Sequence, residues 1–278
     1  MLTQPRVEPR FDYDAAAPRR LARAAADLAT GLRRWRLAAA LAWLDIRNRY
    51  RGSVLGPFWL TLSTAILLGG LGVLYSALFH ETLRSYLPFL AVSIITWNLI
   101  SQVVTDATTL ILAEGMIRQL PLPYATHALR SVFRNVIVAA HNLPLIALVL
   151  AFSGVWPGPG ALLAVPGFAL LCINAFAASL LLGMLCARFR DLPQIVASVM
   201  QLAFFMTPIL WKPEALGPRA VWLLLDPFYV IMQVVRGPLL GAGAPAPIWL
   251  AAGAYTAALA ALSFGFFARF RSRIAFWV

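Results

Sequence analysis

The chain has 278 residues, of which 61% are hydrophobic and 12% are charged. Soluble globular domains contain about 45–50% apolar and about 25% charged residues, so this composition excludes an ordinary soluble domain and predicts an integral membrane protein. The formal net charge is +12, but the arginines lie at the edges of apolar stretches, a distribution that indicates membrane topology rather than nucleic-acid binding.

The first 56 residues precede any stretch that could cross a membrane. Residues 1–31 are rich in alanine, arginine, proline and aspartate, which predicts a partly disordered cytoplasmic arm. Residues 32–56 carry apolar residues on one helical side and arginines elsewhere. This pattern predicts an amphipathic helix at the membrane interface, with an ordinary surface helix as the alternative. The residues assigned to the interface are Arg47, Arg49, Tyr50 and Arg51.

Long uncharged stretches follow within residues 57–278, which we interpret as one transmembrane domain. A helix of about 20 apolar residues crosses the ~30 Å hydrocarbon core of a bilayer, and six stretches are long enough. A glycine- and proline-rich turn at 154–160 divides the longest uncharged stretch, 135–187, into two spans. The other four predicted spans are 57–79, 85–105, 192–211 and 247–268.

The segment between the fifth and sixth predicted spans, residues 212–246, has a different pattern. Its apolar pieces, 221–225 and 227–235, are each too short to cross the membrane. They predict two short re-entrant helices, and backbone at that depth is tolerated only inside protein or beside a wet cavity, as in a gate. The predicted fold is therefore all-α, with six transmembrane helices, an N-terminal amphipathic interface helix and short re-entrant helices before the last span.

The distribution of basic residues predicts the orientation of the chain. Most of the 23 basic residues lie on the same side as the N-terminus if the six spans alternate in direction. Since cytoplasmic loops carry an excess of arginine and lysine, this side is predicted to be cytoplasmic. An even number of spans then places both termini in the cytoplasm.

The sequence lacks the motifs of an ATPase or a metal site. A P-loop requires a lysine within a glycine-rich motif, and the one lysine, Lys212, lies between Trp211 and Pro213. The three histidines and two cysteines are not spaced as metal ligands. We therefore predict that the chain is not an enzyme and binds no cofactor itself.

Polar and aromatic residues within the spans are candidates for a transport path. Asn98, Gln102 and Asp106 recur every four residues and share one helix face, where they line a hydrophilic path or form hydrogen bonds between helices. The aromatic residues include belt residues of the membrane interface, and some could stack on sugar rings. The candidate channel-lining residues are Phe58, Trp59, Tyr75, Asn98, Gln102, Asp106, Phe204 and Phe205.

Two short loops on the predicted cytoplasmic side mix charged and apolar residues. One follows the second span and the other follows the fourth. Such loops could contact a cytoplasmic partner, although loops that only set topology have a similar composition. The candidate partner-contacting residues are Glu114, Arg118, Arg188, Arg190 and Asp191.

Several stretches together carry a family resemblance. They are 47–59 at the start of the first span, 187–194 and 204–211 around the fifth, 226–229 and 235–241 in the outer segment, and 271–277 at the end. With them, the sequence resembles the permease subunit of type-2 ABC exporters, in the polysaccharide and polyol phosphate group. The family more usually has asparagine at the position of Asp226, and the resemblance extends from about Leu32 to the end of the sequence.

The resemblance implies a homodimer that works with two copies of a separate ATPase subunit, which would bind ATP and Mg. Residues around 113–127 would form a coupling helix against that ATPase. The outer half-helices would form a gate that includes Trp211, Asp226, Phe228, Tyr229 and Arg236. The substrate would be a lipid-linked glycan, such as O-antigen or capsule, exported across the bacterial inner membrane.

Two alternatives belong to other functional classes. A permease of the same architecture could export a drug or a lipid, but such a permease would lack the matches at 187–194 and 204–211. An integral membrane glycosyl- or acyltransferase would need a carboxylate cluster or a histidine–aspartate pair near a membrane face, and the sequence shows neither.

Overall fold

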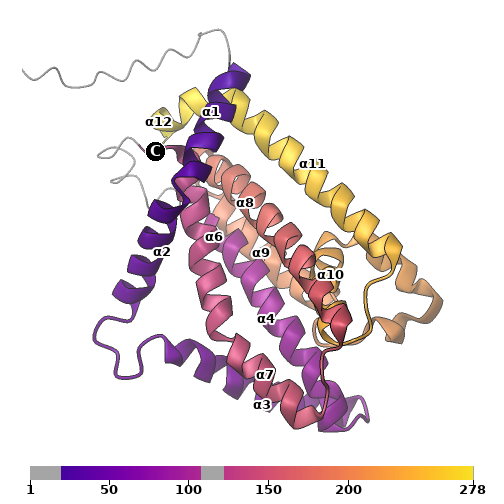
Figure 1. Cartoon of the computed structure of the whole chain (residues 1–278). Coiled ribbons are helices and arrows are strands. Elements are labelled where there is room, and N and C mark those ends of the chain that lie inside the picture. Colours follow the sequence, from indigo (N-terminus) through magenta and orange to yellow (C-terminus); the bar gives the residue numbers. More distant parts are fainter. Residues whose placement is uncertain (1–19, 108–121, 278) are drawn as a thin grey trace, which may run out of the picture.

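The computed structural model describes residues 20–107 and 122–277, and every regular element in these ranges is a helix (Figure 1). The predicted all-α integral membrane fold is thus confirmed. The helices in residues 20–107 are α1 (Arg20–Arg33), α2 (Trp35–Arg49), α3 (Phe58–Leu78) and α4 (Leu83–Ala107). Those in residues 122–277 are α6 (Tyr124–His141), α7 (Leu143–Ser153), η2 (Pro159–Leu163), α8 (Ala164–Arg188), α9 (Leu192–Met206), η3 (Pro213–Leu225), α10 (Pro227–Leu239), α11 (Ala246–Phe270), η4 (Arg271–Arg273) and α12 (Ile274–Trp277).

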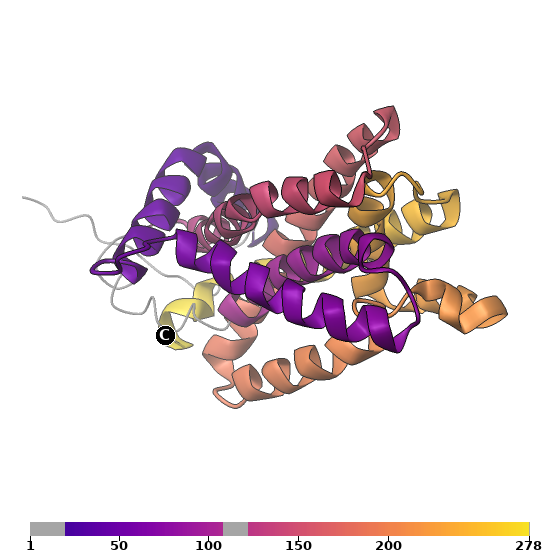
Figure 2. The ribbon, with the colours of Figure 1, turned by 90° about the horizontal axis from the view of Figure 1, so that it is seen from below.

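Five helical segments of the described residues are long and apolar enough to cross a membrane, and the bent pair η3–α10 makes six if it counts as one span. The helices α4, α6, α8 and α11 pack side by side (Figure 1). Within its most apolar window, 72% of α4 is buried, against 17% of α3. Hence α4 lies at the centre of the bundle, and α3 crosses in front of it when the molecule is seen from below (Figure 2).

The predicted fifth span, 192–211, is shorter than expected. Its helix, α9, has 15 residues, a length of about 22 Å at 1.5 Å per residue. The helix ends because Thr207 has an extended backbone (φ −72°, ψ 136°), as the residue before a proline prefers. Residues 207–211 therefore leave α9 and lead to η3 in the outer segment.

The outer segment contains the two short helices that the sequence predicts. The axes of η3 and α10 differ by 113°, and the chain turns at Asp226. The Asp226 carboxylate accepts hydrogen bonds from the amides of Phe228 and Tyr229 at 2.9 and 3.2 Å, and so caps α10. Pro227 at the first helical position has no amide hydrogen to satisfy. These residues explain why a new helix begins here.

The sequence predicts a partly disordered arm over residues 1–31 followed by one helix over 32–56, and the described part of this region begins with a helix at Arg20. Helix α1 already begins at Arg20, and α1 and α2 are separated at Arg34, whose backbone is not helical (φ −89°, ψ 23°). Alanine is the strongest helix former, so this alanine-rich stretch folds where a partner is available. That partner is α6, which both helices contact through small residues such as Ala24, Gly31 and Ala38.

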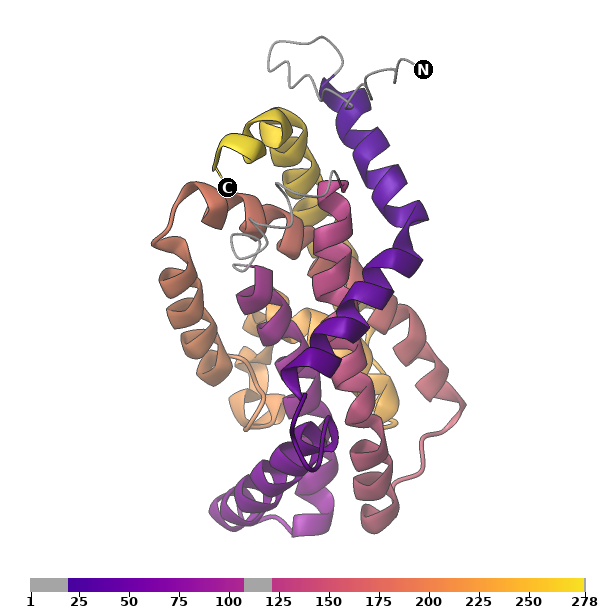
Figure 3. The same cartoon turned by 90° about the vertical axis from the view of Figure 1, so that its left-hand side faces the viewer.

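The first and last helices of the described chain meet at the same end of the bundle (Figure 3). An apolar cluster joins α1, α6, α8, α11 and α12 there; its buried members are Ala24, Tyr124, Ala128, Leu180, Met184, Ala187, Phe267, Ala268 and Ile274. We call this end the terminal end. The loop between α8 and α9 lies at the terminal end, and η3 and α10 lie toward the other.

Candidate functional site

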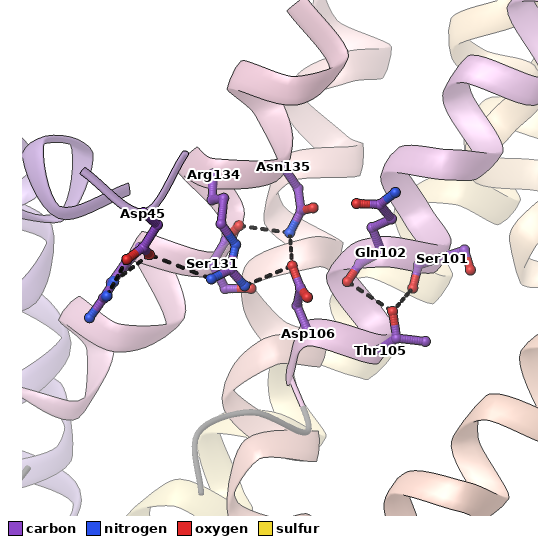
Figure 4. Close-up of polar contacts among 9 residues, drawn as sticks. Asp45, Ser101, Gln102, Thr105, Asp106, Ser131, Arg134 and Asn135 are labelled. Atoms are coloured by element: carbon purple, nitrogen blue, oxygen red, sulfur yellow. Dashed lines mark hydrogen bonds and ion pairs between the residues drawn. The ribbon is translucent and has the colours of Figure 1, made fainter. Parts of the chain in front are cut away.

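An ion-pair network joins α2, α4 and α6 (Figure 4). On α6, the Arg130 Nε donates to Asp45 Oδ2 at 2.7 Å, and its Nη2 contacts the other oxygen of that carboxylate. One turn later, Arg134 places Nη2 2.7 Å from Asp106 Oδ2 and Nη1 3.5 Å from Asp45 Oδ2. Asn135 Nδ2 also donates to Asp106, at 2.8 Å. Arg134 therefore bridges the carboxylates of two helices.

The network is partly buried, because the ionic side chains of Asp45, Asp106, Arg130 and Arg134 are only 17–21% exposed. Charges shielded to this degree are screened less by salt than surface charges are, and removing one leaves its partner poorly solvated. The network thus holds α2 and the end of α4 against α6.

The polar stripe predicted on α4 is divided between two environments. Asp106 belongs to the ion-pair network, which is the interhelical role that the sequence left open. Gln102 is exposed and Asn98 is half-buried, and neither side chain has a hydrogen bond to another residue in the described ranges. Both remain candidates for lining a hydrophilic path, which stays a prediction.

The predicted aromatic lining residues do not meet at one place in the described chain. Phe204 packs against Trp97, with ring centroids 5.9 Å apart, in the core around α4. Its neighbour Phe205 is exposed, as are Phe58 and Trp59 at the start of α3. The exposed rings lie on helices α3 and α9, which are also the least buried parts of the bundle. The half-buried Tyr75 packs against the ring of Phe79, with centroids 5.7 Å apart.

Most of the residues assigned to the outer gate have contacts inside the protein. Asp226 caps α10 and also accepts a hydrogen bond from Thr207 Oγ1 at 2.7 Å. Phe228 packs edge-on against Trp97 at 5.6 Å, and Tyr229 is buried. Trp211 donates its indole hydrogen to the Phe205 carbonyl at 3.2 Å. These contacts fix α10 within the bundle.

Arg236 is the largest fully buried side chain of the described residues, and it is 1% exposed. Its Nη1 donates to Ser93 Oγ at 2.8 Å and to the Pro208 carbonyl at 2.7 Å. Its Nε and Nη2 donate to Gln233 Oε1 at 2.9 and 2.6 Å, and the guanidinium lies 4.5 Å from the centre of the Phe89 ring. A single side chain thus joins α10, α4 and the connection after α9.

Of the two loops that are candidates for contacting a partner, the structure describes the one between α8 and α9. Glu114 and Arg118 lie outside the described residues. Arg188, Arg190 and Asp191 are all exposed at the terminal end, together with Phe189, whose ring lies 5.6 Å from the Arg188 guanidinium. An exposed aromatic ring between arginines is a suitable contact surface for another protein.

Three of the four predicted interface residues line an open groove at the end of α2. Arg47, Arg49 and Arg51 are exposed and Tyr50 is half-buried. With Trp43, three of these residues line the groove, whose volume is about 760 Å³. Their position at a membrane interface stays a prediction.

The ion pairs that join α2, α4 and α6 were not predicted from the sequence. Arg130 and Arg134 lie four residues apart and so share one face of α6, which was a usable signal for an ion-pair network. Asp45 was passed over within the arginine-rich stretch, although a carboxylate there is unusual. No group of three metal-ligating side chains is found in residues 20–107 and 122–277.

Comparison with known proteins identifies the family. The model of the family described as "ABC-2 type transporter" matches residues 36–240. The O-antigen export system permease protein RfbA of Myxococcus xanthus is 24% identical over 201 residues, which cover 70% of this chain and 77% of that protein. Its namesake from Klebsiella pneumoniae is 24% identical over 186 residues, 65% of this chain and 70% of that protein. Because the family model covers more than half of the chain, the protein belongs to the ABC-2 type transporter family.

Proposed function

We propose that the chain is the membrane permease of an ATP-driven exporter that moves a lipid-linked O-antigen or related glycan across the bacterial inner membrane. The observation that carries this proposal is the family match over residues 36–240, together with relatives that are named as O-antigen export permeases. The bundle of long apolar helices supplies the membrane part of such an exporter.

The proposal assigns ATP hydrolysis, with its Mg²⁺, to a separate ATPase subunit. Two copies of that subunit would contact the terminal end, which faces the cytoplasm in the proposed orientation. This orientation is supported by the arginines of α1, α2, η4 and the 188–190 loop, since cytoplasmic segments are rich in arginine. Lys212 lies toward the opposite end, where its Nζ pairs with Glu81 Oε2 at 2.5 Å.

A homodimer is part of the proposal. Helix α9 exposes a row of apolar side chains at helical spacing, namely Ile195, Val199, Leu202 and Met206, and α3 is exposed along most of its length. A second copy of the chain would cover these faces and enclose a path between the two subunits. The exposed rings of Phe58, Trp59 and Phe205 would then lie near that path.

The outer gate is assigned to η3 rather than to α10. Helix α10 is buried and fixed by Asp226 and Arg236, whereas η3 exposes Val221, Trp222 and Leu225. Gly217 inside η3 has φ 53°, a left-handed conformation that glycine adopts without strain and that lets the segment change direction. We therefore expect η3 to be the moving part of the gate.

The 188–191 loop tests the assignment of the ATPase contact. We expect Arg190→Ala and Asp191→Ala each to reduce the transport-coupled ATPase rate of the complex about five-fold or more, which corresponds to about 1 kcal/mol of lost contact energy. Asp191 makes no capping hydrogen bond to α9, so its removal is not expected to destabilise the helix.

Arg84→Ala is the matched control, because Arg84 is also exposed but lies at the start of α4, away from the terminal end and outside η3. The measurement is ATP hydrolysis by the purified complex with and without glycan substrate, at equal amounts of assembled complex. Normal coupling in both loop variants would show that the 188–191 loop does not contact the ATPase.

A further inference from the structure

Helix α1 lies outside the family match, yet it buries a carboxylate. The whole residue Asp27 is 6% exposed and its side chain 2% exposed. Its Oδ1 accepts a hydrogen bond from the amide of Ala125 at 3.2 Å, and its Oδ2 accepts from Arg271 Nε and Nη2 at 3.0 and 2.8 Å. Three segments that are far apart in the sequence therefore meet at one side chain.

The contact with Ala125 caps α6 from another helix. The first amides of a helix have no partner within it, and Pro123, which precedes α6, has no side chain that could accept them. Asp27 supplies both the acceptor and a negative charge at the positive end of the helix dipole. Gly31 keeps the two helices close, since a Cβ at this position would lie 2.6 Å from the Cβ of Ala125.

The contact with Arg271 ties the same point to the C-terminal end of α11. The Arg271 guanidinium lies 6.0 Å from the centre of the Tyr124 ring, which begins α6. Ala24, one turn before Asp27, is fully buried in the cluster that also contains Phe267. The start of α6 is thus contacted by Asp27 of α1 and by Arg271 at the end of α11, and the sequence alone assigned a functional role to neither.

A second junction holds the end of α4. Asp106, the penultimate residue of α4, is paired with Arg134, and Arg134 also reaches Asp45 on α2. Helix α1 therefore contacts the start of α6 through Asp27, and α2 is linked to the end of α4 through Arg134 of α6, which pairs with both Asp45 and Asp106. Each contact is ionic and partly or fully buried, so neither is exchanged freely for water.

We propose that α1 and α2 form one positioning arm, in which Asp27 fixes the start of α6 and Asp45, through Arg134, fixes the end of α4, so that ATP hydrolysis is coupled to transport. This inference rests on the proposed function and on the coupling helix that the family resemblance implies around residues 113–127, between these two helices. Both aspartates act through other residues of the chain, Asp27 through Ala125 and Arg271 and Asp45 through Arg130 and Arg134, so both are positioning residues. Their loss uncouples the two activities because the N-terminal helices no longer hold the two helix ends.

The test uses the permease in complex with its ATPase in proteoliposomes, with ATP hydrolysis measured over a range of ATP concentrations, with and without glycan substrate. Asp27→Ala removes both contacts, and Asp27→Asn keeps an acceptor for the Ala125 amide but loses the charge that pairs with Arg271. Asp45→Asn weakens the second junction. Arg23→Ala, on the exposed side of α1, is the matched control for a charge change in the same helix.

We expect Asp27→Ala to lower the substrate-stimulated kcat at least five-fold while KM for ATP and the subunit ratio stay unchanged. Asp27→Asn and Asp45→Asn should fall between this variant and the wild type, and Arg23→Ala should equal the wild type. A merely structural role would lower the yield of complex in proportion to activity and leave the stimulation per complex intact.

Full stimulation per assembled complex in Asp27→Asn and Asp45→Asn would overturn the inference, and these milder variants decide the question if Asp27→Ala does not fold. If the wild-type complex itself shows no ATP-dependent export, the proposed function fails. If the wild type exports glycan and all three aspartate variants do so equally well, only the positioning arm fails.

Discussion

Replacement of Arg236 by methionine is expected to destabilise the protein more than any other single substitution of a polar residue. Methionine has no donor, so Ser93 Oγ, the Pro208 carbonyl and Gln233 Oε1 would lose their hydrogen bonds in the interior. Each buried acceptor left unsatisfied costs about 1–3 kcal/mol. The sum corresponds to a fall in the unfolding midpoint on the order of 10 °C for a protein of this size.

The measurement is the thermal unfolding midpoint of the purified protein in detergent, with Arg219→Met as the control for loss of an exposed arginine in the neighbouring helix η3. Arg236→Lys should lie between the wild type and Arg236→Met, because one ammonium group cannot reach both Gln233 and the pair Ser93–Pro208 as a planar guanidinium does. Equal midpoints for Arg236→Met and Arg219→Met would mean that Arg236 does not hold α10 in place.

The second large effect is expected from a single added methyl group. Gly167 on α8 lies against the backbone of α10, and a Cβ there would stand 2.3 Å from the Val234 carbonyl oxygen. Since the obstacle is backbone rather than a flexible side chain, Gly167→Ala requires the two helices to separate. Small residues serve this purpose in membrane proteins, where close helix approach is a main source of stability. We expect a loss of about 2–3 kcal/mol or more.

Gly253→Ala in α11 is the matched control, because its added Cβ would have no atom of a neighbouring element of the described residues within 4 Å. In a helix, glycine to alanine at an open position is expected to be neutral or slightly stabilising. The unfolding midpoints of the two purified variants give the comparison, and the amount of glycan at the cell surface gives the functional effect. If Gly167→Ala is as stable as Gly253→Ala, α8 and α10 do not pack as closely as described.

The spans were predictable because the bilayer imposes a simple rule. A helix that crosses it needs about 20 apolar residues, and this rule located α3, α4, α8 and α11 to within a few residues. The same rule failed for α9, whose apolar stretch continues to Trp211 while its helix ends at Met206. There the local preference of Thr207 before Pro208 decided the structure, and hydropathy does not report that preference.

The role of the charged residues was not predictable in the same way. Asp27 and Arg271 are 244 residues apart, and nothing near either of them marks the other as its partner. An alanine- and arginine-rich stretch such as 20–33 has the composition of a disordered arm, and only packing against α6 and α11 makes it a helix with a buried carboxylate. Pairing of this kind depends on tertiary structure, which the local pattern does not contain.

In helix α4, the sequence predicted where the polar residues lie but not which role each of them has. The spacing of Asn98, Gln102 and Asp106 correctly placed them along α4, and the choice between a hydrophilic path and interhelical bonds was left open. The structure shows interhelical bonds for Asp106, because Arg134 and Asn135 of α6 lie within reach. Gln102 is exposed, and its place in a hydrophilic path stays a prediction.

The central claim is that the chain exports a lipid-linked glycan and does not make it. The most direct test deletes its gene in the organism that encodes it and measures glycan on the cell surface and lipid-linked glycan inside the cell. The account predicts that surface glycan disappears, that lipid-linked glycan accumulates on the cytoplasmic side, and that a plasmid copy reverses both. Loss of surface glycan without accumulation, or unchanged surface glycan, would contradict it.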